Sequence, residues 1–337
     1  MSVPRSISIA LYLAVLLVAL ARPADAAETI AGRVVRGSES GPPLEGTTVT
    51  LRLFDGERLV EERRGTASAD GSFAFAEVPS FPDREFQVVV PYDGVTYESD
   101  RLPLDGAQRD VSITVYAATH EDAVLQLRSV TVVLGQVDAS HQRIHALELV
   151  TVENASRQTF APAPPGEGGR PMGFLRFPLP PLASDLTARG ALEGVQLLQV
   201  DAGFGAPLAV PPGQFELAFS YQFPYNTREY LWSRAWPYPV ASLQVLVPEG
   251  SAVLESSDLA PGGTMEIAGR TLHVYRAQDI PRGATVAFRL RGLPVPGAFG
   301  LPYEEGTARV VALALAGAGV LVALRRAVRG RGPRSSP

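Results

Sequence analysis

The sequence predicts an all-β protein made of two tandem β-sandwich domains, together with an N-terminal signal peptide and one C-terminal transmembrane helix. Glycine and proline are abundant, at 32 and 29 residues, whereas only 19% of the residues are charged. This composition favours short strands joined by turns over long surface helices. Apolar and polar side chains alternate along many interior segments, which is the period of a half-buried strand. A chain of 337 residues allows two ordinary domains and terminal segments.

Residues 1–26 have the pattern of a secretory signal peptide. Arg5 precedes an apolar run from Ile7 to Ala21, and Ala24 and Ala26 follow with Ala-x-Ala spacing. This order of a basic residue, an apolar run and small residues predicts export with cleavage after Ala26. An uncleaved membrane anchor is the alternative interpretation.

The first domain, residues 27–118, is predicted to be a small β-sandwich of six or seven strands. Val49, Leu51 and Leu53 alternate with polar residues, and Asp93-Gly94 is a strong hairpin signal. Val111, Ile113 and Val115 are expected to face inward. The predicted strands are 29–36, 47–54, 58–65, 72–78, the two arms of the hairpin 85–99, and 109–117.

Three features of this domain resemble a known family. They are Gly32 in the first strand, the turn "PLEG" at 43–46, and "TASADGSFAF" at 66–75. With them the domain resembles the carboxypeptidase regulatory-like domain, a transthyretin-like β-sandwich, at the start of a bacterial exported protein. The resemblance implies a folding, spacing or recognition module without peptidase activity. Asp70-Gly71 is then a tight turn, and Phe73 and Phe75 are core residues.

No metal site, cofactor site or catalytic residue is predicted. The chain has four histidines and no cysteine. His141 and His145 lie in a segment that alternates as a strand, which places them about 13 Å apart, too far to share one ion. His120 lies in a linker and His273 in a strand. No nucleophile elbow, phosphate-binding loop or dinucleotide fingerprint occurs.

The second domain, residues 119–293, is predicted to be a larger β-sandwich of about ten strands. Its segments loosely resemble the longer β-domain of bacterial membrane-anchored exported proteins, which implies no activity. Phe215, Leu217, Phe219, Tyr221 and Phe223 occupy alternate positions of one strand and are expected to form a buried face. The predicted strands are 125–134, 143–154, 173–186, 194–201, 213–223, 240–250, 252–256, 264–269, 270–277 and 284–293.

The aromatic segment 225–238 is predicted to be a long loop or an irregular sheet edge. It contains both tryptophans of the chain, mixed with arginines. Tryptophan, tyrosine and arginine on a loop are typical of protein-interaction hot spots. The predicted partner-binding residues are Tyr230, Trp232, Arg234, Trp236 and Tyr238. Two alternatives stay open: a lid over the sandwich core, or contact with lipid or sugar.

Several polar residues of the second domain are ambiguous in the sequence. Asp138, Glu148 and Glu153 are carboxylates on or beside strands, and such side chains are usually solvated. Asn154 begins "NAS", which matches a glycosylation acceptor. In a bacterial sequence an Asx-turn is the simpler interpretation.

The C-terminal segments indicate a membrane anchor. A stalk rich in proline and glycine at 294–306 precedes an apolar segment at 307–324, and five arginines without any acidic residue occur in the tail 325–337. The fifteen-residue apolar core spans about 23 Å as a helix, and flanking side chains extend its reach. Arginines directly after such a segment predict a cytoplasmic tail. The protein is therefore expected in the cell membrane as a single-pass protein with a periplasmic or extracellular body.

These observations favour a non-catalytic, membrane-anchored protein that binds or scaffolds another envelope or inner-membrane protein. A net charge of −5 gives no reason to expect nucleic-acid binding. A carbohydrate- or surface-ligand-binding module is the alternative, and it requires Trp232 and Trp236 to be exposed. A hydrolase with an unrecognised site is a third hypothesis, which requires a carboxylate or histidine with a shifted pKa in a cleft.

Overall fold

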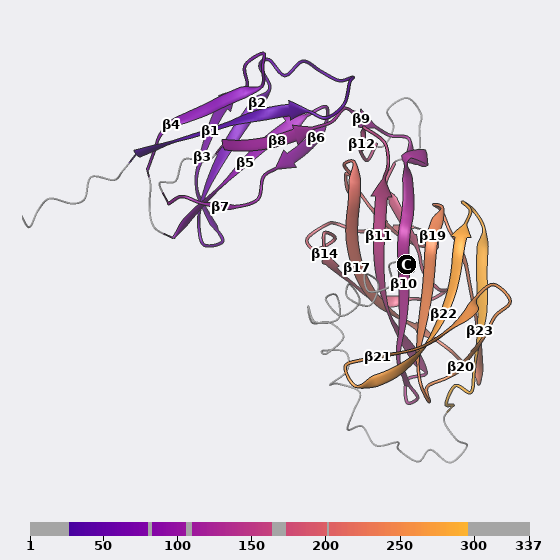
Figure 1. The fold of residues 1–337 in the computed structure, drawn as a ribbon. Helices are drawn as coiled ribbons and strands as arrows, with labels where there is room; N and C mark the ends of the chain where they lie inside the picture. The colour runs from indigo at the N-terminus through magenta and orange to yellow at the C-terminus, as the bar shows by residue number, and fades with distance from the viewer. Residues whose placement is uncertain (1–26, 80–82, 106–109, 164–172, 201, 296–337) are drawn as a thin grey trace, which may run out of the picture. The chain divides into compact units, whose positions relative to one another are not determined.

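The computed structural model describes residues 27–79, 83–105, 110–163, 173–200 and 202–295 (Figure 1). The predicted signal peptide, transmembrane helix and tail, and most of the predicted stalk, lie outside these residues. The all-β prediction is confirmed, since the described residues form strands and one short 3₁₀ turn, η1 (Asp122–Val124). None of the described segments is a helix with the length and apolar character needed to cross a membrane. The chain forms two compact units that divide between Ala118 and Thr119.

The first unit contains one mixed sheet and one antiparallel sheet. One has the order β4-β1-β8, in which β1 and β8 run parallel, and the other has the order β3-β2-β5-β6, with β7 added beside β5. Both sheets bury alternate side chains, as in a sandwich. The strands are β1 (Ala27–Arg36), β2 (Thr48–Asp55), β3 (Arg58–Thr66), β4 (Ser72–Pro79), β5 (Arg84–Tyr92), β6 (Val95–Glu98), β7 (Leu102–Pro103) and β8 (Asp110–Val115).

The core of the first unit follows the predicted alternation. Phe73 and Phe75 are buried, and their rings lie 6.1 Å apart. The hairpin at Asp93-Gly94 joins β5 to β6, and both turn residues have positive φ. The other predicted inward residues are also buried, namely Val49, Leu51, Leu53, Val111, Ile113 and Val115. The apolar residues at every second position therefore face the interior, because successive side chains of a strand point to opposite faces.

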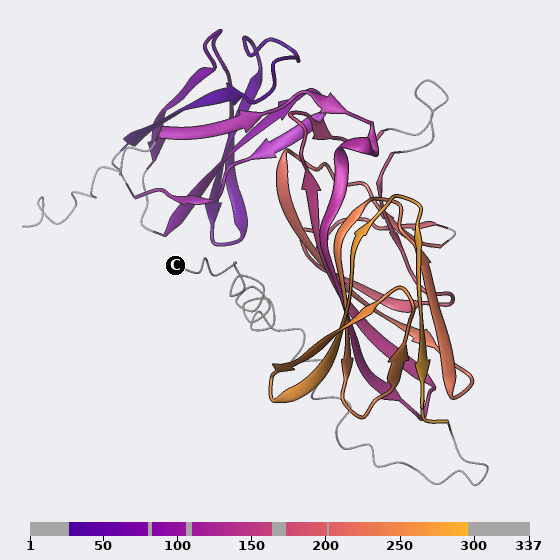
Figure 2. The ribbon, with the colours of Figure 1, turned by 45° about the vertical axis from the view of Figure 1, so that its right-hand side comes forward.

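The second unit is built on one seven-stranded sheet of order β14-β17-β11-β10-β19-β22-β21. Its long strands β17, β11, β10 and β19 run side by side in Figure 1, and Figure 2 shows their strong twist. The pair β10–β19 is parallel and the others are antiparallel. The strands are β10 (Leu125–Asp138), β11 (Arg143–Asn154), β14 (Ser184–Gly190), β17 (Gly213–Pro224), β19 (Val240–Pro248), β21 (Ala260–Ile267) and β22 (Arg270–Ile280).

Two three-stranded sheets complete this unit. Their orders are β13-β16-β15 and β18-β23-β20, and their buried side chains belong to the same core as those of the seven-stranded sheet. Phe177 of β13, for example, stacks on Phe204 of β16 and contacts Phe219 of β17. The strands are β13 (Leu175–Pro178), β15 (Leu198–Val200), β16 (Gly203–Ala206), β18 (Glu229–Ala235), β20 (Val253–Glu255) and β23 (Thr285–Arg291), and β9 (Ala118–Thr119) pairs with β12 (Thr159–Phe160).

The buried face of β17 is close to the prediction. Leu217, Phe219, Tyr221 and Phe223 are all buried, whereas Phe215, near the start of the strand, is only partly buried. The aromatic rings of residues 219, 221 and 223 follow one another at centroid distances of 6.3 and 6.1 Å. This row of rings forms one wall of the core.

Two predicted elements are wrong. The segment 173–186 is not one strand, because β13 ends at Pro178 and β14 begins at Ser184 in a different sheet. Proline has no N–H for a ladder, and Pro180 and Pro181 follow Pro178, so the chain leaves one sheet before it joins the next. The segment 225–238 is neither a long loop nor an irregular edge, because residues 229–235 form the regular strand β18, which does lie at an edge of its sheet. The short strand β16 was not predicted.

Candidate functional site

The aromatic segment forms an interior wall of the second unit. β18 pairs with β23 in unbroken antiparallel register from Glu229↔Arg291 to Ala235↔Thr285. Its burial alternates, so that Trp232 and Arg234 face inward while Leu231, Ser233 and Ala235 face solvent. A strand in a sandwich has one buried and one exposed face, and that alternation decides which aromatic side chains reach the surface.

The predicted partner-binding residues are therefore mostly inaccessible. The relative exposure is 1% for Trp232, 5% for Arg234, 2% for Trp236 and 1% for Tyr238. Tyr230 is partly buried, with its ring 4.9 Å from the ring of Phe223. Four of these side chains fill the core of the sandwich, so a partner cannot reach them in this structure. The interpretation that agrees with the structure is the structural one, in which the aromatics close the core.

These residues surround a buried ion pair that the sequence analysis did not identify. The guanidinium of Arg234 donates two hydrogen bonds to the carboxylate of Glu148, with Nη1 to Oε2 at 2.8 Å and Nη2 to Oε1 at 2.6 Å. The hydroxyl of Tyr221 donates a third hydrogen bond to Oε1 at 2.6 Å. Paired, two-point contacts between guanidinium and carboxylate are among the strongest polar interactions in proteins.

The aromatic rings enclose the cation of this pair. The guanidinium carbon of Arg234 lies 5.0 Å from the ring centroid of Trp232 and 4.8 Å from that of Trp236. Trp232 in turn stacks on Phe288 of β23, with centroids 4.7 Å apart and planes 15° from parallel. Contact with two indole faces adds electrostatic attraction for a desolvated guanidinium. We call Glu148, Arg234, Tyr221, Trp232 and Trp236 the buried polar cluster.

The electrostatics of the cluster keep Tyr221 neutral and Arg234 charged. Burial, and then the negative charge of Glu148, raise the pKa of Tyr221 well above its usual value, so its hydroxyl remains a donor. Burial alone would lower the pKa of Arg234, but the charge of Glu148 outweighs it and raises the pKa. The guanidinium therefore stays charged inside the core.

Donors outnumber acceptors in the buried polar cluster. Nε of Arg234 and the indole N–H groups of Trp232 and Trp236 are buried, and the described residues provide no hydrogen-bond partner for any of them. The carboxylate of Glu148, by contrast, accepts three bonds. The cluster thus depends on this single acceptor group.

The position of the cluster indicates a structural task. Glu148 lies on β11 and Tyr221 on β17 of the seven-stranded sheet, whereas Arg234 lies on β18 of a facing sheet. The ion pair therefore joins the two layers of the sandwich. Glu148 is 1% exposed, so it is closed to solvent. The expectation that this carboxylate is solvated is wrong, since it occupies an inward position of β11.

The other polar residues that the sequence analysis named are engaged locally. Partial burial alone would raise the pKa of Asp138, but the hydrogen bonds that it accepts from Ser140 and His141 together outweigh burial and lower the pKa. Glu153 Oε2 accepts a hydrogen bond from Nε2 of Gln126 at 2.6 Å. Asn154 is 2% exposed and accepts from the backbone and hydroxyl of Ser156, which is the Asx-turn that the sequence analysis favoured.

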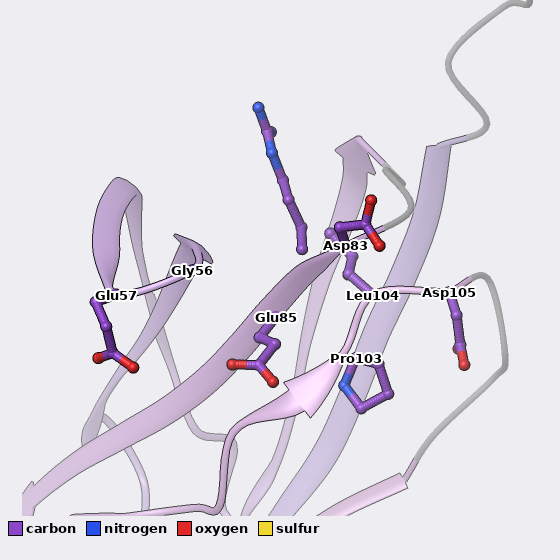
Figure 3. A pocket seen from close by; sticks show the side chains of 8 residues that line it. Gly56, Glu57, Asp83, Glu85, Pro103, Leu104 and Asp105 are labelled. Carbon is purple, nitrogen blue, oxygen red and sulfur yellow. The ribbon is translucent and has the colours of Figure 1, made fainter.

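The first unit has an acidic hollow of about 460 Å³ at the ends of β2, β5 and β7 (Figure 3). Glu57 is already paired with Arg101 at 3.1 Å. Within the described residues no group of three histidine, cysteine, aspartate or glutamate side chains has an arrangement that holds a metal ion. The lining residues are Gly56, Glu57, Asp83, Arg84, Glu85, Pro103, Leu104 and Asp105. This arrangement gives no specific ligand chemistry.

Comparison with known proteins gives no functional assignment. No protein-family model matches the chain, and no curated protein matches it.

Proposed function

We propose that this chain is a non-catalytic, membrane-anchored β-sandwich protein of the bacterial cell envelope that binds another envelope or inner-membrane protein. The body lies on the periplasmic or outer side of the membrane, held by the segment 307–324. The likeness of residues 27–118 to a carboxypeptidase regulatory-like domain supports a recognition or spacing role in place of catalysis. The closed buried polar cluster supports the same view, because its charged groups are built into the core.

The observation that carries this proposal is the outer face of the sheet β18-β23-β20. Leu231 and Val253 are exposed there, at 62% and 61%, beside the central strand β23. Arg289 contacts Glu229 at 2.7 Å, and Arg291 lies 3.2 Å from Glu255. The face therefore alternates apolar side chains with half-exposed ion pairs of both signs. We call the side chains Glu229, Leu231, Val253, Glu255, Arg289 and Arg291 the outer patch.

The composition of the outer patch fits a protein partner. Apolar side chains set among arginine and carboxylate groups are typical of protein interfaces, where arginine is enriched. The patch has no excess of positive charge, so it does not suit a nucleic acid. A carbohydrate-binding role requires exposed tryptophan rings, and the burial of Trp232 and Trp236 removes that support.

The proposed orientation in the membrane is tested by cysteine labelling. The chain suits this method because it contains no cysteine of its own. Ser257→Cys lies at an exposed position of the body, and Ser335→Cys lies in the basic tail. A membrane-impermeant maleimide is expected to label residue 257 in intact cells whose outer layer admits the reagent, and residue 335 only after lysis. Labelling of both residues, or of neither, before lysis would contradict the proposed orientation.

The proposed binding is tested by crosslinking in native membranes. We expect the wild-type protein to crosslink to one other envelope protein, and the double variant Leu231→Arg with Val253→Arg to lose that product. Leu59→Arg is the matched control, since Leu59 is an exposed leucine of β3 in the first unit. Loss of the product in the control, or its persistence in the double variant, would move the binding surface away from the outer patch.

A further inference from the structure

The open edge of β18 has main-chain groups without a partner. Within the described residues β18 pairs with β23 alone and is an edge of its sheet. Trp236 N–H bonds to Ala284 O at 3.1 Å, and Leu293 N–H bonds to Arg228 O at 3.1 Å. Successive residues of an antiparallel strand direct their main-chain groups to opposite sides. The even-numbered residues therefore face β23, and residues 229, 231, 233 and 235 face the open edge.

One end of this edge is already capped. The hydroxyl of Thr227 donates to Glu229 O at 2.6 Å and accepts from Glu229 N–H at 3.2 Å. The N–H and C=O groups of Leu231, Ser233 and Ala235 have no such cap from the described residues. All three residues are exposed. They therefore present a row of donors and acceptors with the spacing of a β-ladder.

The other outer strands of this unit do not offer an edge of this kind. β14 and β21 have register shifts in their ladders, and β15 and β20 have three residues each. β13 ends in Pro178, and the N–H of Arg176 already bonds to the hydroxyl of Tyr238. Bulges, short strands and proline are the usual means by which proteins block strand addition at an edge. β18 has seven residues, no proline and no register shift.

An apolar groove lies at the C-terminal end of β18. Its volume is about 240 Å³, and Ala235 and Trp236 line one part of it, while Phe177 and Pro178 of β13 line another. Val200, at the end of β15, also lines it. The groove therefore lies next to Ala235, the last residue with an uncapped edge. It has the size and character to take one large apolar side chain.

We propose that β18 binds an extended segment of the partner protein by β-strand addition. The added strand pairs with the N–H and C=O groups of Leu231, Ser233 and Ala235, and it places a large apolar side chain in the groove beyond Ala235. A polypeptide backbone matches a row of alternating donors and acceptors at strand spacing, whereas a lipid or a sugar does not. This inference rests on the proposed function and specifies how the partner is held.

The test uses full-length protein in native membranes. Ser233→Cys carries a thiol-linked photocrosslinker at the edge, and Ser257→Cys carries it away from the edge as a reference. We expect the edge position to crosslink to one short extended segment of another protein. A crosslink from residue 233 to this chain itself, in the same molecule or in a second copy, would overturn the proposal. No crosslink to another protein from either position would count against the proposed function as well.

The decisive comparison then uses a synthetic peptide that covers the crosslinked segment. Ser233→Pro removes only an N–H that faces away from β23, a position where an edge strand tolerates proline. Ser233→Ala, the matched control, keeps that N–H. We expect the peptide to slow amide exchange at Leu231, Ser233 and Ala235 of the wild type. Its affinity is expected to fall about tenfold in Ser233→Pro, because one ladder bond is lost, and to be unchanged in Ser233→Ala.

Two results would separate the two proposals. Equal peptide affinity of Ser233→Pro and Ser233→Ala would overturn strand addition while the binding function stands. Loss of binding in Leu231→Arg with Val253→Arg, but not in Ser233→Pro, would assign the partner to the outer patch and away from the edge. Tryptophan fluorescence checks that each variant is folded, because Trp232 and Trp236 flank residue 233 and are buried in the native core.

Discussion

Glu148 is the residue on which the buried polar cluster depends. Its carboxylate accepts two hydrogen bonds from the guanidinium of Arg234 and one from the hydroxyl of Tyr221. An ion pair buried to this degree costs desolvation energy for both partners, so its net contribution to stability is small. The loss of one partner is a different matter, because the other charge then stays in the core without compensation.

We therefore expect Glu148→Gln to destabilise the second unit strongly. The substitution keeps the shape of the side chain but removes the charge opposite Arg234. The free energy of unfolding is expected to fall by about 3–5 kcal/mol. Urea denaturation followed by tryptophan fluorescence measures it, since both tryptophans of the chain, Trp232 and Trp236, contact Arg234.

A double variant provides the control for this prediction. Glu148→Leu combined with Arg234→Met removes both charges, and we expect it to be more stable than Glu148→Gln because no buried charge remains unpaired. A loss of less than about 1 kcal/mol in Glu148→Gln would show that water or a rearranged core compensates the guanidinium, since changes of that size are ordinary for exposed sites.

The cluster shows what sequence could and could not predict at single residues. Glu148 occupies the same inward phase as Ile144 and Val150, so the alternation of β11 already placed it in the core. A carboxylate at an inward position requires a cationic partner. That partner, Arg234, lies 86 residues further along the chain. A sequence pattern gives the face of a side chain, but it does not give which distant strand lies opposite.

At the scale of elements, β18 shows that the alternation of side chains along a strand predicts its buried face. Trp232, Arg234, Trp236 and Tyr238 all have even numbers, so the period of two was present in the sequence. The mixture of Arg228, Glu229 and Arg234 with the aromatic residues predicts a long loop or an irregular sheet edge instead. The structure has an unbroken ladder over residues 229–235. In this segment the alternation was a better guide to structure than the composition.

The strands of the first unit were predicted more closely than those of the second. Hairpin neighbours such as β5 and β6 are joined by a turn whose residues fix the register, so the local sequence is sufficient. The pairing of β1 with β8 joins residues far apart in the chain. The two strands run parallel, so no hairpin turn in the sequence predicts their pairing. Gly32, one of the residues on which the predicted resemblance rests, lies opposite Val111 of β8 in this pairing.

We expect Gly32→Ala to destabilise the first unit. A Cβ at this position would lie 2.2 Å from the carbonyl oxygen of Val111 in β8 and 2.5 Å from the ring of Phe73. The backbone of β8 would have to move, so the cost is expected to be about 1–3 kcal/mol or more. Hydrogen–deuterium exchange of peptides from β1 and β8 measures it, and the exchange of both is expected to become faster.

Gly65→Ala is the matched control for this prediction. Its added methyl group would lie 3.2 Å from the ring edge of Phe75, a side chain that can shift, and not against a backbone oxygen. A smaller effect on exchange is therefore expected. If Gly65→Ala and Gly32→Ala had the same effect, close approach of β1 to β8 would not be the reason for glycine at position 32.

At the scale of the whole molecule, each unit has the parts it needs to fold. The first unit buries alternate residues of its own two sheets, and the buried polar cluster lies entirely within the second unit. The division at Ala118 and Thr119 separates two sets of strands, and of these only the short strand β9 spans it. Each of the two units is expected to fold and unfold independently, since a domain with its own core folds by itself.

The two destabilising substitutions test this independence when each is measured against both units. Glu148→Gln is expected to shift the urea transition that tryptophan fluorescence reports, and to leave the exchange of residues 27–118 unchanged. Gly32→Ala is expected to do the reverse, because it lies in a unit without tryptophan. Substitutions that share no contacts add independently, so the double variant should show both effects at their single-variant size. A single transition moved by either substitution would mean that the two sandwiches unfold together, and that a partner bound at β18 would then stabilise the first unit as well as the second.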